Sequence, residues 1–277
     1  MDIDYKLDEP WTILSAIEQS IKKKIESIGT PLKDWDIRIN YGIKTGLNDA
    51  FIISKEKRDE LVKADPKSDE IIRPILRGKD IGRNTYTFAD LYVITAYKGI
   101  SLIMKETYPA VFEHLKQFEE KLRKRGQCEG TATSPGSNQH HWLELDNNVS
   151  QEKLDDFLKP KIVWGNLNLR ASFALAPAGM FVSAPSPILS PASDYLLAVL
   201  NSKVADYYIR SLGVVRNGGY FEYKPMFVQQ LPVPKVDENT ELKFSQIILN
   251  EDLGIADDLI YEMYDLNQEE IDFISKA

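Results

Sequence analysis

The apolar positions of residues 10–28 repeat every three or four residues, which is the spacing of one face of an α-helix. Pro10 stands near the beginning of this segment and Gly29 follows its end, as helix termini prefer. The pattern therefore predicts an amphipathic helix with one apolar stripe, formed by Ile13, Ile17, Ile21, Ile25 and Ile28.

Two longer segments have the same periodicity. Residues 108–125 carry four apolar side chains on one face and end in a basic cluster, and residues 194–212 are largely apolar. The first predicts an amphipathic helix and the second a buried one. Helical patterns also occur at 55–63 and in two patches near the C-terminus, the last at 260–274.

Strand patterns fill the intervals between these helices. Residues 32–53 predict a strand, a glycine-containing turn and a second strand, whereas Pro74 and Gly78 are predicted to break the segment 71–80. Further strand patterns occur at 87–97, 142–145, 161–164, 181–183 and, after a Gly218–Gly219 turn, 220–223. The chain is therefore predicted to be α+β, with short, mainly antiparallel strands and several helices.

The composition agrees with a folded protein of the cytoplasm. Of 277 residues, 43% are hydrophobic, and no apolar run approaches the roughly 18 residues that span a bilayer. The acidic N-terminus lacks the pattern of a signal peptide. A single cysteine, Cys128, excludes an internal disulfide framework.

The net charge of −8 is concentrated at one end of the chain. Residues 236–277 contain 12 acidic and 2 basic side chains, whereas residues 1–235 contain 30 acidic and 32 basic ones. The body of the chain is thus nearly neutral, and its charge neither requires nor excludes a nucleic-acid partner.

Several motifs occur in an order that is typical of one family. They are GTPLKDWDI (29–37), GIKTGLNDAFII (42–53), IIRPILRGKDI (71–81), HWLEL (141–145), LKPKIVWGNL (158–167), YLLAVLNSKVADYYI (195–209) and VQQLPVPK (228–235). Together they resemble the TaqI-like C-terminal specificity (target-recognition) domain of type IIG restriction–modification enzymes and adenine-specific DNA methyltransferases. The resemblance covers residues 11–277.

The resemblance implies sequence-specific recognition of double-stranded DNA, which positions an N6-adenine methyltransferase, and possibly a nuclease, on its target. It implies a helical connector at 1–30, a target-recognition domain at 31–235 and an acidic helical tail at 236–277. The family's methyltransferase half carries an Asn-Pro-Pro-Tyr type motif and a glycine-rich cofactor segment, and this sequence contains neither. We therefore expect no catalysis and no cofactor in this chain, with S-adenosylmethionine and Mg²⁺ bound only by the catalytic parts of the parent protein.

Candidate DNA-binding residues are those whose side chains suit base edges or phosphates. Arginine matches guanine, asparagine and glutamine match adenine, and basic side chains contact phosphates without reading sequence. The polar, glycine-rich loop 126–139 is the favoured base-reading segment. The candidates are Lys44, Thr45 and Asn48; Arg73, Arg77, Lys79 and Arg83; Arg123, Lys124, Arg125, Gln127, Asn138, Gln139, His140 and His141; Asn166, Asn168 and Arg170; and Arg216, Asn217 and Tyr220.

Each group also has a purely structural interpretation. Gly42 and Gly46 can simply allow a bend, with Asn48 bonded to its own backbone. The basic run of residues 73–83 can be a solvated face, and cations at residues 123–125 stabilise a helix C-terminus without any ligand. Asn-Gly-Gly at 217–219 is above all a turn signal.

Two patterns imitate catalytic or metal sites. Asp206, Glu222 and Lys224 have the residue types of a metal-dependent nuclease, but Asp206 lies inside the apolar helix predicted for 194–212. His140 and His141 are adjacent and lack further ligands at metal-binding spacing. We therefore predict neither a nuclease nor a metal site.

A second hypothesis is a protein-interaction module. The acidic tail and the first helix would then dock on the methyltransferase half, and the chain would bind little DNA by itself. Steep salt dependence of DNA binding would distinguish the two hypotheses.

Overall fold

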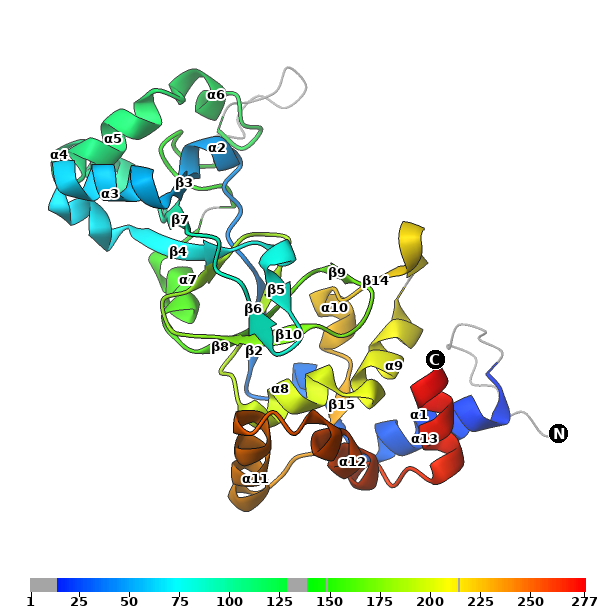
Figure 1. Cartoon of the computed structure of the whole chain (residues 1–277). Coiled ribbons are helices and arrows are strands. Elements are labelled where there is room, and N and C mark those ends of the chain that lie inside the picture. Colours follow the sequence, from blue (N-terminus) through cyan, green and yellow to red (C-terminus); the bar gives the residue numbers. More distant parts are fainter. Residues whose placement is uncertain (1–13, 129–138, 148, 214) are drawn as a thin grey trace.

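The computed structural model describes residues 14–128, 139–147, 149–213 and 215–277. Figure 1 shows an elongated molecule with two lobes. The first lobe comprises residues 43–76 and 87–160 together with strand β11, and the second lobe comprises the other described residues. Within these ranges, no helix is both long and apolar enough to cross a membrane.

The first lobe is built on a four-stranded sheet in the order β11-β4-β7-β3. Strands β4, β7 and β3 are antiparallel, and β11 pairs parallel to β4. The strands are β3 (Ile52–Ser54), β4 (Ile72–Leu76), β7 (Leu91–Ile94) and β11 (Phe181–Val182). The helices are α2 (Asn48–Phe51), α3 (Lys55–Ala64), α4 (Met104–Thr107), α5 (Pro109–Lys116), α6 (Glu119–Arg123) and α7 (Gln151–Asp155).

The second lobe is built on an antiparallel sheet in the order β10-β8-β12-β2. Its strands are β2 (Arg38–Tyr41), β8 (Lys161–Trp164), β10 (Phe173–Ala176) and β12 (Pro187–Ser190). Its helices are α1 (Ala16–Ile28), α8 (Asp194–Asn201), α9 (Lys203–Leu212), α10 (Pro225–Val228), α11 (Glu238–Leu249), α12 (Leu253–Met263) and α13 (Gln268–Lys276). Strand β1 (Thr30–Pro31) pairs with β15 (Pro232–Val233).

The sheet of the second lobe separates two hydrophobic cores. Along β8, Ile162 and Trp164 belong to the second core, whereas Val163 belongs to the first. Successive side chains of a strand point to opposite faces, so both faces of this sheet are buried. The shared sheet thereby joins the two lobes.

Two small strand assemblies complete the fold. Strands β13 (Val215–Arg216), β14 (Tyr220–Glu222) and β9 (Leu167–Asn168) form an antiparallel outer sheet, whose β13–β14 end projects from the second lobe in Figure 1. Strands β5 (Ile81–Gly82) and β6 (Thr85–Tyr86) form a hairpin that packs near β10.

The α+β class and the short strands are as predicted, and β2 and β3 both form. They do not pair, however, because β2 joins the sheet of the second lobe, β3 joins that of the first, and α2 lies between them. Gly42 lies at this crossing, where a Cβ atom would approach the Val182 carbonyl oxygen to 2.3 Å. Glycine is therefore required here for close backbone contact.

Both long predicted helices are interrupted. In segment 108–125, α5 ends at Lys116 and Phe118 leaves the helical conformation before α6 begins. In segment 194–212, the Ser202 hydroxyl accepts from Ala205 N and caps a new helix, α9. Periodicity continues across both breaks, so it could not reveal them.

Three other local predictions are corrected. Residues 142–145 form turns and no strand. Strand β4 runs through Pro74, because β11 joins that side of β4 only from Ile75 onward and no ladder bond is lost. The tail contains three helices, and the patch at 260–274 is divided between α12 and α13.

Candidate nucleic-acid interface

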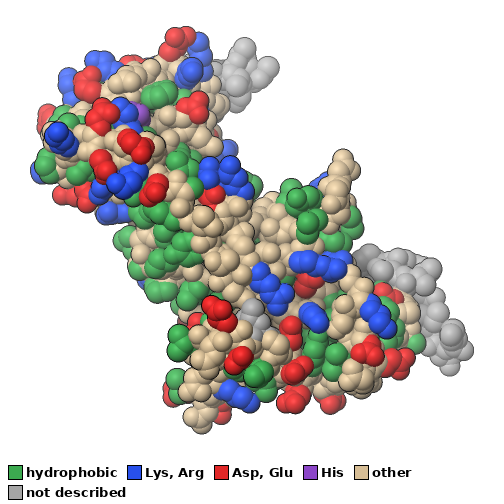
Figure 2. All heavy atoms as spheres, viewed as in Figure 1, with side chains coloured by type: hydrophobic (Ala, Val, Ile, Leu, Met, Phe, Trp, Pro, Cys, Tyr) green, Lys and Arg blue, Asp and Glu red, His purple; other side chains and the backbone are tan. Residues whose placement is uncertain are grey.

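The predicted DNA-binding residues lie mainly on two parts of the molecule. Figure 2 shows that the outline is hollowed between the first lobe and the projecting end of the outer sheet. One set of candidates lies on the outer sheet, and another lies around α2, α6 and residues 139–147 of the first lobe.

The outer sheet unites candidates that are far apart in sequence. Asn168 pairs with Phe221 of β14, and Arg216 of β13 pairs with Tyr220 of the same strand. Asn166 and Arg170 flank β9, while Asn217 lies in the exposed turn between β13 and β14. Two polar segments about 50 residues apart thus form one surface.

Arg216 is held by a buried carboxylate on this sheet. Its Nε donates to Glu222 Oε1 at 2.6 Å, and its Nη2 contacts the same oxygen. Lys224 Nζ lies 2.9 Å from Glu222 Oε2. The two cations lower the pKa of the Glu222 carboxyl. Glu222 is only 5% exposed in its side chain, whereas Arg216 is 53% exposed, so the arginine is anchored from inside and open outside.

A second buried carboxylate supports the back of the outer sheet. Asp206 Oδ1 accepts from Ala171 N at 2.7 Å and from the Tyr223 hydroxyl, and Arg170 and Arg210 contact its Oδ2. Burial and the Asp206 charge raise the pKa of the Tyr223 hydroxyl well above its usual range. These contacts explain the placement of Asp206 inside an apolar helix.

The nuclease-like pattern does not assemble into one site. Asp206 is engaged by Arg170, Arg210 and Tyr223, whereas Glu222 is engaged by Arg216 and Lys224. In the part of the chain that the structure describes, no three His, Cys, Asp or Glu side chains are grouped so that they could hold a metal ion.

Arg125 forms a buried clamp in the first lobe. Its Nη1 donates to the Thr45 carbonyl at 2.9 Å, and its Nη2 donates to the carbonyls of Trp142 and Glu144 at 2.8 Å. Nη1 also lies 3.2 Å from Asp146 Oδ1. The clamp ties the end of α6 to the turn before α2 and to residues 142–146.

The clamp continues into a buried polar cluster. His140 Nε2 lies 3.2 Å from Asp146 Oδ1, and Cys128 Sγ lies 3.3 Å from His140 Nδ1. Lys44, which is half exposed, approaches Asp146 at 3.7 Å. Gly46 has a positive φ of 73°, and a Cβ there would meet Asp146 Oδ1 at 2.3 Å. The cluster therefore fixes the shape of the 42–48 turn.

Three of the predicted DNA-binding side chains are turned inward. Thr45, Arg125 and His140 are all buried, so they shape the loops instead of presenting groups to a ligand. The Thr45 hydroxyl donates to Asn48 Oδ1 at 2.6 Å. This bond replaces the backbone bond that was considered for Asn48.

The other candidates differ in how firmly they are held. Arg73 donates to two backbone carbonyls, Arg77 to both oxygens of Asp80, and Gln127 to Asn147. Arg123 and Lys124 pair with Glu119 and Glu120 along α6. Asn138 lies outside the described residues. The candidate residues that are exposed to solvent are Lys44, Asn48, Lys79, Arg83, Arg123, Lys124, Gln139, His141, Arg170, Arg216, Asn217 and Tyr220.

Sequence reasoning missed the acidic residues that organise these basic groups. Sequence patterns identified neither Asp146 nor Glu222 as a partner of a basic residue. Glu222 was assigned only to the nuclease-like pattern with Asp206 and Lys224. Alternation in YFEYK places Tyr220, Glu222 and Lys224 on one face of a strand, and this spacing indicates that Glu222 can pair with a neighbouring cation. No local signal identifies Asp146, because its partner Arg125 lies 21 residues away.

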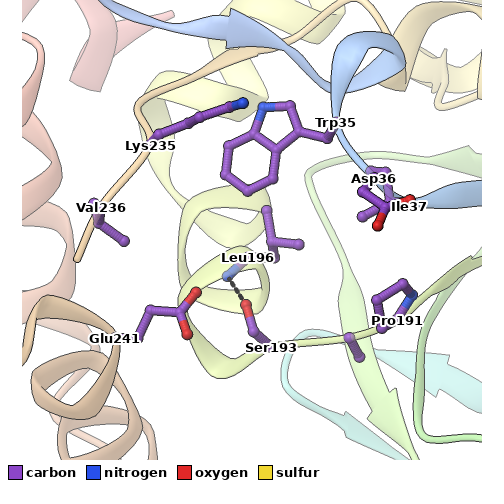
Figure 3. A pocket seen from close by; sticks show the side chains of 10 residues that line it. Trp35, Asp36, Ile37, Pro191, Ser193, Leu196, Lys235, Val236 and Glu241 are labelled. Carbon is purple, nitrogen blue, oxygen red and sulfur yellow. Dashed lines mark hydrogen bonds between the residues drawn. The ribbon is translucent and has the colours of Figure 1, made fainter. Parts of the chain in front are cut away.

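A separate hollow of about 360 Å³ lies in the second lobe. Figure 3 shows its Trp35 wall, with Lys235 Nζ 6.0 Å from the centre of the indole ring, and with Glu241 at another side. Ser193 in its lining caps α8. None of the predicted DNA-binding residues line this hollow.

Comparison with known proteins yields a family match and two related methyltransferases. Residues 73–233 match the TaqI-like C-terminal specificity domain. The chain is 22% identical over 282 aligned residues to the type II methyltransferase M.BstVI of Geobacillus stearothermophilus, covering 98% of this chain and 47% of the relative. It is 19% identical to the type II methyltransferase M.PaeR7I of Pseudomonas aeruginosa, covering 95% and 44%. The chain thus spans about half the length of these relatives.

The fold is similar to that of a solved protein. The type IIL restriction–modification enzyme MmeI, whose structure is in complex with DNA, matches with a TM-score of 0.63 and 14% identity. The match covers 89% of this chain and 36% of the MmeI chain.

Proposed function

This chain belongs to the TaqI-like C-terminal specificity domains, and from that membership we propose that it recognises a specific sequence in double-stranded DNA. The observation that carries the proposal is the outer sheet, where Arg216 is braced from inside by Glu222 and exposed outside. A side chain prepared in this way suits recognition of a partner with matching acceptors.

The recognition serves a larger restriction–modification enzyme. We propose that the domain positions an N6-adenine methyltransferase, and in some arrangements a nuclease, on the target site. S-adenosylmethionine and Mg²⁺ would be bound by those catalytic parts. Relatives about twice as long as this chain support this division of labour.

The hollow between the lobes suggests how DNA is held. A two-stranded ribbon fits the major groove of B-DNA, so the β13–β14 end would read base edges. Lys44 on the first lobe and Lys79 on the turn before β5 are exposed cations and would contact phosphates. Arg125 would act indirectly, by holding the turn that carries Lys44.

The chain would be organised in three parts: a connector at 1–30, the recognition domain at 31–235 and a tail at 236–277. Contacts between the two ends support joint placement of connector and tail. Ser20 and Lys24 of α1 bond to Glu270 of α13 at 2.6 and 2.8 Å. A catalytic partner attached through the connector would therefore lie beside the tail.

The test is a titration of the full chain against random-sequence duplexes at two salt concentrations, with sequencing of the retained DNA. We expect one short asymmetric site to be enriched, with binding that weakens as salt rises because phosphate contacts release counterions. Binding without an enriched site would leave only a phosphate-binding surface. Absence of binding at both salt concentrations would contradict the proposal for the isolated chain.

Docking on the methyltransferase half is the second candidate function. The apolar side chains of Leu242, Leu249 and Ile255 are exposed on the acidic α11–α12 segment, which favours a protein partner. A docking module would show no salt-dependent binding to bare DNA. It would instead bind the catalytic portion of the parent protein.

A further inference from the structure

Arg216 is an exposed cation held by a buried carboxylate, as Arg38 is by Asp156, but Arg216 also lies beside the turn of the projecting β13–β14 ribbon. We propose, on the basis of the proposed function, that Arg216 reads a guanine in the target site and that Glu222 is its positioning residue. The inference selects one base-reading side chain from the many polar candidates.

The bonding of the guanidinium carries the first part of the argument. Nε and Nη2 are both directed at Glu222 Oε1, and Lys224 holds the other carboxylate oxygen. This leaves the Nη1–Nη2 edge, with two parallel N–H donors, for an external acceptor pair. Guanine O6 and N7 form such a pair in the major groove.

The contrast with Arg123 carries the second part. Arg123 pairs with Glu119 one turn away on α6, and the Glu119 side chain is itself 37% exposed. Such a pair on a helix surface is weak, and the Arg123 guanidinium also packs over the ring of buried Trp142, 5.3 Å from the ring centre. Glu222 is buried and holds the Arg216 side chain in one orientation before DNA binds. Binding a base therefore costs Arg216 less conformational entropy.

The surroundings of Arg216 carry the third part. Register places Tyr220 opposite Arg216 and Leu167 opposite Glu222, so these side chains lie on one face of the sheet. Tyr220 and Leu167 are both exposed beside Arg216. Apolar side chains next to an arginine provide contacts for base edges and the thymine methyl group.

The turn that bears this arginine is narrow. Gly218 and Gly219 both have positive φ, at 80° and 78°, which closes the ribbon between β13 and β14. The ribbon projects away from the second lobe in Figure 1. It can therefore enter a groove before the rest of the lobe meets the DNA backbone.

The experiment measures sequence selection by the full chain and by four variants: Arg216→Ala, Arg216→Lys, Glu222→Gln and, as a matched control, Arg38→Ala, which removes another exposed arginine held by a buried carboxylate. Each protein is selected on random duplexes. Its affinity is then measured on the enriched duplex and on duplexes with single base-pair changes. Circular dichroism and thermal unfolding confirm that each variant is folded.

We expect Arg216→Ala to lose the preference for guanine at one position, by roughly 5- to 150-fold, while preferences elsewhere persist. Arg216→Lys should not restore it, because an ammonium lacks the paired donors of the guanidinium. Glu222→Gln should reduce the same preference by a smaller factor. Arg38→Ala should leave every preference unchanged.

Four results would overturn the inference. Arg216→Ala could keep the same guanine preference, or it could weaken binding equally on all sequences, as loss of a phosphate contact would. An unaltered Glu222→Gln profile would overturn the positioning role of Glu222. If the unaltered chain binds DNA without any sequence preference, Arg216 is not a base reader, whereas absence of DNA binding would overturn the proposed function itself.

Discussion

The first lobe and the outer sheet use the same chemistry for opposite purposes. Arg125 and Arg216 each meet an acidic side chain and lie in segments rich in glycine and polar residues. The Arg125 side chain is 4% exposed and donates to several backbone carbonyls, whereas that of Arg216 is 53% exposed and donates to Glu222. An arginine whose N–H groups bond to backbone carbonyls fixes the loops that carry those carbonyls. An arginine bonded to a single carboxylate keeps other N–H donors for a binding partner.

The comparison predicts that the two regions respond differently to substitution. Changes in the buried clamp should affect the free energy of unfolding. Changes at exposed cations should affect DNA binding and leave folding unaltered.

The largest effect is expected for Arg125→Leu. It leaves Asp146 buried without its guanidinium partner and several carbonyls without donors, which should lower the free energy of unfolding by about 3–5 kcal/mol. Urea unfolding would measure the change, with Arg123→Leu as a control that should cost at most about 1 kcal/mol. Equal losses in the two variants would refute the distinction between clamp and surface.

A second buried cation tests whether burial alone is costly. Lys161 Nζ donates to the carbonyls of Pro177 and Met180, and burial lowers the pKa of this amine to about 8. Between pH 8 and about 10.5 the unfolded chain binds the proton more strongly than the folded chain. The free energy of unfolding should therefore rise across this window, by up to about 3 kcal/mol, and the cost should be fully present below pH 8.

Lys161→Met is the matched variant for this test. The unfolding free energy of the variant minus that of the unaltered protein should fall as pH rises from 8 to 10. Only the unaltered protein gains stability from the titration of Lys161 over this range. Urea unfolding at several pH values measures it. Parallel pH profiles would show that Lys161 titrates normally.

Two glycines compare the regions at the level of the backbone. Gly46 and Gly218 both have positive φ, but a Cβ at Gly46 would collide with Asp146, whereas at Gly218 the nearest atom is 3.5 Å away on Tyr220. Gly218→Ala should cost about 1 kcal/mol from conformation alone, and Gly46→Ala about 2–3 kcal/mol because the clamp must also shift. Thermal unfolding would rank the two variants, and a larger cost at Gly218 would contradict the comparison.

The smallest effect is expected for Lys79→Ala. Lys79 is exposed on the short 3₁₀ turn that follows β4, so its loss should leave the free energy of unfolding unchanged within about 0.5 kcal/mol. If it contacts a phosphate, the slope of log K against log salt should fall by about 0.9 for every DNA sequence alike. An unchanged slope would remove Lys79 from the interface.

Local patterns predicted much of this fold and less of the candidate site. Periodicity identified α1, where Ile21 and Ile25 are fully buried, and strand-like composition identified β8 and β14. Helix breaks escaped detection because Ser202 and Phe118 interrupt the backbone without interrupting the apolar pattern.

The inward orientation of Arg125 could not be predicted for a different reason. Its acceptors are backbone carbonyls at Thr45, Trp142 and Glu144, which any residue type could provide. Only the tertiary fold brings them together. In sequence, Arg125 is indistinguishable from its exposed neighbours Arg123 and Lys124.

The path of the chain through the β10-β8-β12-β2 sheet of the second lobe has an evolutionary consequence. The chain leaves this sheet after Tyr41 and re-enters it at Lys161, on the two strands that flank β12. The register places Tyr41 opposite Pro187 and Ile162 opposite Leu189, so the two crossing points lie at opposite ends of two parallel strands, roughly 14 Å apart. We expect related proteins to lengthen, shorten or exchange the segment between Tyr41 and Lys161 during evolution, while the sheet keeps its strand register.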